Sequence, residues 1–91
     1  SGGRGMLEGL VVPLREALRP GYVLAASLDV NGFIRVWVER VHDGTTVTVD
    51  IPHDVWERGS AAEAADLAHV IRAAFDRGER HTIYLPRGEE H

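Results

Sequence analysis

Apolar and polar residues alternate through the middle of the chain, residues 22–51, and two turn signals divide this stretch into three strands. Asn31-Gly32 and Asp43-Gly44 are dipeptides that favour tight hairpin turns. A three-residue loop at residues 30–32 keeps one side of the first hairpin aliphatic, whereas a one-residue slip would invert every side chain. We therefore predict a three-stranded antiparallel meander. Its buried face is predicted to hold Leu24, Ala26, Leu28, Ile34, Val36, Val38, Val47, Val49 and Ile51.

This register makes specific predictions about which residues face each other. Leu28 is expected opposite Ile34 and Leu24 opposite Val38, and a two-residue turn at Asp43-Gly44 sets Val38 opposite Val49. Trp37 then lies on the second face of the sheet, on the central strand, and its expected neighbours are Ala25 and Asp50.

Helical patterns lie on both sides of the meander. Pro13 fits the first residue of a short helix over 13–19, preceded by a turn or kinked arm over 6–12. Residues 52–59 are expected to form a loop. Ser60 and Glu63 form a capping box that opens a longer helix, which ends near Arg77 because Gly78 provides a left-handed stop. The core stripe of this helix is predicted to be Ala64, Leu67, Ala68, Ile71, Ala74 and Phe75.

The sequence therefore predicts one α+β domain over residues 6–86, with the element order α-β-β-β-α-β and both helices on one face of the sheet. His81–Leu85 is expected to be a short fourth strand at the sheet edge, parallel to strand one or strand three. Residues 1–5 resemble an expression scar, and residues 87–91 are expected to form a mobile tail.

Composition limits the classes of function. The chain has 91 residues, 44% hydrophobic content and a net charge of −4, so we expect one small core and no overall basic field for nucleic acid. It has no cysteine, which excludes disulfides and thiolate metal sites. All ten basic residues are arginine, a bias typical of a GC-rich bacterial genome. No apolar run is long enough to span a membrane, so we expect a cytoplasmic protein, and no cofactor is predicted.

The second sheet face is the strongest candidate for function. The central strand places Phe33, Arg35, Trp37 and Glu39 on this face, and Ala25 and Asp50 are expected beside Trp37. Aromatic residues with arginine are typical of the cores of protein interfaces. We therefore predict a small non-enzymatic interaction module, such as an adaptor, chaperone-like protein or inhibitor, that binds a protein partner or a second copy of itself.

Three alternatives remain open. The fourth strand, the N-terminal arm or Trp56 could cover Trp37 within the same chain. Single-stranded nucleic acid could stack on Phe33 and Trp37, although Arg35 is opposed by several carboxylates and this binding is disfavoured. A hydrolase or metal site at Asp50, His53 and Asp54 is the least favoured, because the spacing matches no closed metal motif.

The order α-β-β-β-α over residues 13–77, with Gly59-Ser60 before an alanine-rich helix, is similar to that of the double-stranded RNA-binding domain. In that family, lysines at the start of the second helix contact phosphate. This chain has Ala61, Ala62 and Glu63 there, so the resemblance implies the topology and not the RNA-binding function.

Overall fold

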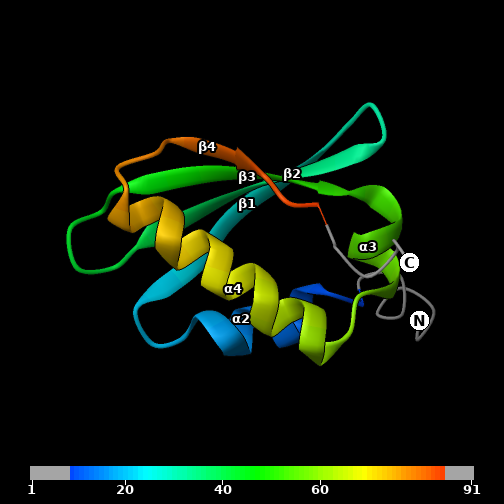
Figure 1. Ribbon diagram of the computed structural model, residues 1–91, viewed down its shortest axis with the longest axis horizontal. Coiled ribbons are helices and arrows are strands. Elements are labelled where there is room, and N and C mark those ends of the chain that lie inside the picture. The colour runs from blue at the N-terminus through cyan, green and yellow to red at the C-terminus, as the bar shows by residue number, and fades with distance from the viewer. Residues whose placement is uncertain (1–8, 86–91) are drawn as a thin grey trace.

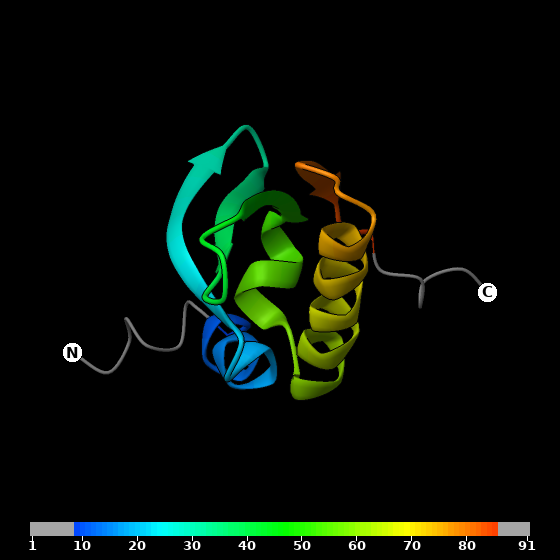
Figure 2. The same cartoon turned by 90° about the vertical axis from the view of Figure 1, so that its left-hand side faces the viewer.

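The computed structural model describes residues 9–85, which form a four-stranded sheet with all of their helices on one side (Figures 1 and 2). The strand order is β1-β2-β3-β4, in which the first three strands are antiparallel and β4 runs parallel to β3. The predicted α+β class is confirmed. The elements are α2 (Val11–Leu18), β1 (Tyr22–Val30), β2 (Phe33–Arg40), β3 (Thr46–Pro52), α3 (His53–Arg58), α4 (Ala61–Asp76) and β4 (His81–Ile83).

Some of the sequence predictions fall outside the described residues. These are the expression scar at 1–5, the tail at 87–91, and residues 6–8 of the N-terminal arm.

The helix α4 forms as its sequence predicts. The Ser60 hydroxyl accepts a hydrogen bond from the backbone N–H of Glu63, and the Glu63 carboxylate accepts one from the Ser60 N–H. Gly78 follows the helix with a φ of 74°, the left-handed conformation that a glycine stop requires. The whole predicted stripe is buried: Ala64, Leu67, Ala68, Ile71, Ala74 and Phe75.

Two other helical predictions need correction. The first helix begins at Val11 and not at Pro13, which lies in the first turn, where a missing N–H costs no intrahelical hydrogen bond. The predicted loop over 52–59 contains the short helix α3, because Val55 and Trp56 are buried against the core and one helical turn places both inward.

The first hairpin differs from its predicted register, and the reason is local. Asn31 and Gly32 form a two-residue loop with φ values of 44° and 86°, and left-handed values at both positions are what a type I′ turn needs. Leu28 therefore lies opposite Arg35 and not opposite Ile34. A β-bulge at Ala25 then restores the predicted pairing of Leu24 with Val38.

This bulge changes the face of several residues in β1. Leu28 is 55% exposed and Ala26 is exposed, so neither belongs to the core as predicted. Ser27 and Asp29 take the inward register positions opposite Val36 and Ile34. The core consequently lies under the base of β1 and does not extend to its far end.

The second hairpin has a four-residue loop, residues 41–44, in place of the predicted two-residue turn. Val38 pairs with Val47 and not with Val49, a shift of two residues that leaves every side chain on its predicted face. Within the loop, Asp43 accepts two hydrogen bonds from the Arg40 guanidinium, at 3.2 and 2.8 Å. The buried hydrophobic residues of the two strands are those predicted: Ile34, Val36, Val38, Val47, Val49 and Ile51.

Candidate interaction surface

The sheet has one face turned away from the helices, and we call it the open face. The alternation of side chains and the strand register assign its members. Their backbone positions come from all four strands. The open face consists of Val23, Ala26, Leu28, Val30, Phe33, Arg35, Trp37, Glu39, Thr46, Thr48, Asp50, Pro52, His81 and Ile83.

Trp37 lies near the middle of the open face and is partly exposed, as predicted. Its cross-strand neighbours are Ala26 and Thr48, so the predicted neighbours are wrong. Ala25 is the unpaired residue of the bulge, and Asp50 lies opposite Arg35. The correction follows from the two hairpin loops, each of which differs from its predicted length.

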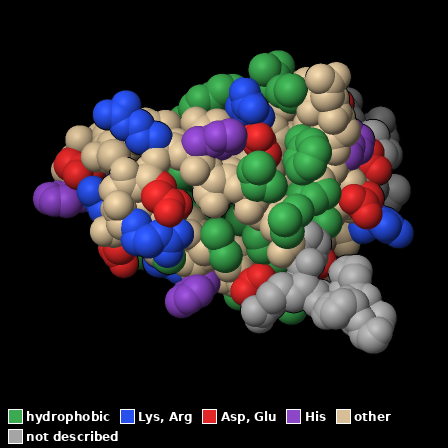
Figure 3. All heavy atoms as spheres, turned by 45° about the horizontal axis from the view of Figure 1, so that its top comes forward, with side chains coloured by type: hydrophobic (Ala, Val, Ile, Leu, Met, Phe, Trp, Pro, Cys, Tyr) green, Lys and Arg blue, Asp and Glu red, His purple; other side chains and the backbone are tan. Residues whose placement is uncertain are grey.

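Large apolar side chains surround this centre. Val23 is 45% exposed, Leu28 is 55% exposed and Ile83 is 52% exposed. Figure 3 shows hydrophobic side chains gathered over this side of the sheet, with charged groups and histidine among them. The sequence placed Leu28 in the core, so the size of the apolar surface emerged only with the structure.

Trp56 and the fourth strand were two segments that could cover Trp37 within the same chain, and neither covers it. Trp56 is 7% exposed within the core, and β4 pairs with β3 at the sheet edge. In Figure 1, no element of residues 9–85 crosses the open face. The part of the N-terminal arm over residues 6–8 lies outside the described residues.

A charged network lies on the open face, and the register creates it. Arg35 donates from Nε to Asp50 Oδ1 at 2.8 Å and from Nη2 to Asp50 Oδ2 at 3.2 Å. His81 Nε2 lies 3.1 Å from Asp50 Oδ2. Asp50 is 8% exposed, and the hydrogen bonds from Arg35 lower the pKa of its carboxyl group against the opposing effect of burial. His81 adds to this lowering. The carboxylate is therefore held in its ionised form.

His81 is an exposed residue whose contact with Asp50 was not predicted from the sequence. It lies 31 residues from Asp50 in the sequence, and the parallel pairing of β4 with β3 brings the two together. No local pattern signals such a contact. The Arg35–Asp50 pair follows from the β2–β3 register, which the sequence prediction placed two residues away.

The predicted cluster of Asp50, His53 and Asp54 is divided among separate partners. His53 lies 3.4 Å from an oxygen of Asp29 and 3.3 Å from one of Glu57. Asp54 pairs with Arg58 at 3.4 Å through exposed side chains. Among residues 9–85, no group of three or more histidine and carboxylate residues has a geometry that could hold a metal ion.

Comparisons with known proteins found no matching family model, no similar curated protein and no similar solved structure. Within the described part of the chain, none of the helices combines the length and the apolar character needed to cross a bilayer.

Proposed function

We propose that this protein is a non-enzymatic interaction module whose contact surface is the open face around Trp37. The observation that carries the proposal is a sheet face that no element of residues 9–85 covers, with an aromatic centre and three half-exposed aliphatic side chains, Val23, Leu28 and Ile83. Apolar patches of this kind on a small domain mark sites of association, because burying them removes apolar surface from water.

We further propose that the partner is a second copy of the chain. Each copy carries a net charge of −4, so two copies repel each other in most orientations. On the open face, Arg35 neutralises Asp50, which leaves Glu39 as the remaining carboxylate near the centre. Two copies that approach through this face therefore meet a nearly neutral, apolar centre, and a two-fold axis lets one patch serve both copies.

The pairing of Arg35 with Asp50 also favours protein contact over the binding of single-stranded nucleic acid. Stacking of single-stranded nucleic acid on Phe33 and Trp37 would need a free cation beside the rings. The guanidinium of Arg35 is already bound to Asp50 by two hydrogen bonds. Protein contact requires no free cation, and we therefore prefer it.

The test compares the wild-type protein with Trp37→Ala and Val12→Ala in sedimentation velocity over a range of concentrations. Val12 is a matched control because it is 59% exposed and lies on α2, away from the open face. We expect a wild-type dimer, an unchanged Val12→Ala dimer, and at least about thirtyfold weaker association for Trp37→Ala, the effect of losing an interface hot spot.

Circular dichroism and urea unfolding establish that the Trp37→Ala variant is folded before its mass is interpreted. A strictly monomeric wild type at several hundred micromolar contradicts self-association and leaves a different protein as the partner. A dimer that Trp37→Ala leaves unchanged shows that the contact surface lies elsewhere.

A further inference from the structure

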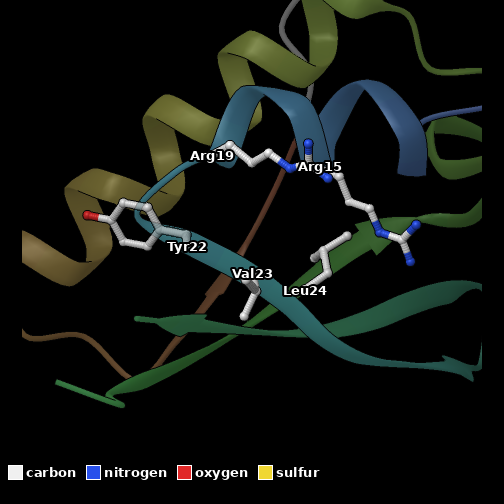
Figure 4. Close-up of a pocket in the computed structure, with 5 residues that line it drawn as sticks. All are labelled: Arg15, Arg19, Tyr22, Val23 and Leu24. Carbon is white, nitrogen blue, oxygen red and sulfur yellow. The ribbon is translucent and has the colours of Figure 1, made fainter. Parts of the chain in front are cut away.

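A groove runs between α2 and the edge strand β1. Its first part is a hollow of about 260 Å³ lined by Arg15, Arg19 and residues 22–24 (Figure 4). A second hollow of about 120 Å³ shares Arg15 and Leu24 with the first, so the two are neighbours along the strand. Its remaining lining residues are Val11, Ala25, Ala26, Ser27, Val36 and Trp56. We call this feature the α2–β1 groove.

The groove exists because α2 packs mainly against α4 and only lightly against β1. Arg72 on α4 donates a hydrogen bond to the backbone carbonyl of Ala17 at 2.7 Å and so holds α2 toward α4. Beyond the bulge at Ala25, the small polar side chain of Ser27 takes the inward position opposite Val36. The space that a large aliphatic side chain would fill is thereby left open.

The groove carries two arginines that no other group in residues 9–85 binds. Arg15 and Arg19 are four residues apart, and Figure 4 shows both side chains extending from the end of α2 over the groove. Neither side chain makes a hydrogen bond or ion pair in the described part of the chain, whereas most of the other arginine side chains there do. The arginines with such partners are Arg35, Arg40, Arg58, Arg72 and Arg77.

β1 also has a free edge. It is the first strand in the sheet order and pairs only with β2 among the described residues. An edge strand presents backbone N–H and C=O groups to whatever extended chain approaches it. The bulge at Ala25 restricts regular pairing to a few residues on each side, which suits a short segment.

We propose that the α2–β1 groove binds an extended acidic peptide segment of another protein, which adds to the sheet as a strand beside β1. Peptides that bind in this way gain affinity from backbone hydrogen bonds and specificity from pockets for alternate side chains. One carboxylate meets Arg15 and Arg19, whose planar guanidinium groups suit bidentate binding of a carboxylate. An apolar side chain two residues away enters the second hollow against Leu24 and Trp56.

The positive charge that would attract an acidic peptide is confined to the groove. The protein as a whole is acidic, so its general field does not attract an acidic partner. Arg15 and Arg19, whose side chains have no partner among residues 9–85, make this groove a local exception. The neighbouring carboxylate on α2, Glu16, follows Arg15 directly in the sequence, and adjacent helical positions do not share a face. Binding should therefore weaken as the salt concentration rises.

The experiment selects from a displayed library of random heptapeptides against the wild-type protein and against the double variant Arg15→Ser, Arg19→Ser. The matched control is Arg58→Gln, Arg77→Gln, which also removes two arginines, both with exposed side chains, but outside the groove. We expect the wild type and the control to enrich peptides with an acidic residue and an apolar residue two positions apart, and the groove variant to bind them at least tenfold more weakly.

A synthetic copy of an enriched peptide then tests the backbone contact. N-methylation of alternate residues removes the backbone N–H donors that strand addition needs. It should therefore abolish binding, together with the changes that the unmodified peptide causes in the amide chemical shifts of β1. The proposal is overturned if no acidic peptide is enriched, if enriched peptides bind the groove variant equally well, or if N-methylation has no effect. A change in oligomeric state in the groove variant would assign the groove to a second copy and would equally overturn it.

Discussion

Arg35 and Asp50 face each other across β2 and β3 and are joined at two points, by hydrogen bonds of 2.8 and 3.2 Å. The pair holds a nearly buried carboxylate on a sheet face that is otherwise open, and His81 approaches it from β4. It thus links three strands through side chains as well as through the backbone. Because the two charges cancel, they leave the apolar character of the surrounding face intact.

We expect Arg35→Gln to destabilise the protein more than Arg58→Gln does. The first substitution leaves the nearly buried carboxylate of Asp50 without its cation, and a buried charge that loses its partner is costly. The second removes an ion pair between exposed side chains, which contributes little. Urea unfolding followed by tryptophan fluorescence measures both midpoints. Equal midpoints would contradict a structural role for the pair.

The lowered pKa of Asp50 predicts how the stability depends on pH. A carboxyl group with a folded-state pKa below its ordinary value of 3.8 stabilises the fold above that value, and this contribution is lost as the pH falls through the folded-state pKa. The stability advantage of the wild type over Asp50→Asn should therefore be present at pH 5 and shrink toward pH 2.5.

Urea midpoints of both proteins over this pH range provide the measurement. Remaining at or below pH 5 avoids the range in which histidine side chains usually titrate. Asp54→Asn is the control, because its exposed pairing with Arg58 should make little difference at any pH. An advantage over Asp50→Asn that does not change between pH 5 and pH 2.5 would show that the ion pair does not form.

The register of the first hairpin places Leu28 on the open face, so its contribution to stability should be smaller than that of a leucine in the core. Leu28 is 55% exposed on the open face, so Leu28→Ala should change the free energy of unfolding by less than about 0.5 kcal/mol. Leu67 is fully buried, so Leu67→Ala should cost about 2–5 kcal/mol. Chemical denaturation at a protein concentration low enough to exclude dimers compares them. A cost above about 2 kcal/mol at Leu28 would favour the register in which it faces Ile34.

The Asn31-Gly32 turn depends on a backbone conformation that only one of its residues adopts freely. Gly32 has a φ of 86°, and a Cβ added there would meet no atom within 4 Å, so Gly32→Ala tests the backbone alone. We expect a loss of about 1 kcal/mol, the usual cost of placing alanine in the left-handed region. Gly21→Ala is the control, since Gly21 also has open space around it and no positive φ. Equal thermal midpoints for the two variants would contradict the two-residue turn.

The first hairpin shows where prediction from the sequence succeeded and where it failed. The aliphatic pattern correctly paired Leu24 with Val38, and the Asn-Gly signal correctly marked the turn. The two requirements differ by one residue in register, and a three-residue loop would satisfy the aliphatic pattern. The protein instead keeps the two-residue turn and inserts a bulge at Ala25. The far end of β1 is not buried, so the turn sets the register there, and the core sets it only at the base.

The members of the open face on β2 could be predicted from the sequence, but their neighbours on the other strands could not. The alternation along β2 was sufficient to place Phe33, Arg35, Trp37 and Glu39 on one face. It could not identify their neighbours, which depend on two loop lengths and on the pairing of β4. Ala25 and Asp50 were therefore placed incorrectly beside Trp37, and the exposure of Leu28 was missed.

The sequence alone determined the features that depend on residues a few positions apart: the capping box and glycine stop of α4, its buried stripe, the inward faces of β2 and β3, and the α+β class. The tertiary structure decided the features that join distant segments. These are the approach of His81 to Asp50, the bulge in β1 and the α2–β1 groove. The physical reason is that caps and periodicity act through local geometry, whereas register and grooves depend on how all the elements share one core.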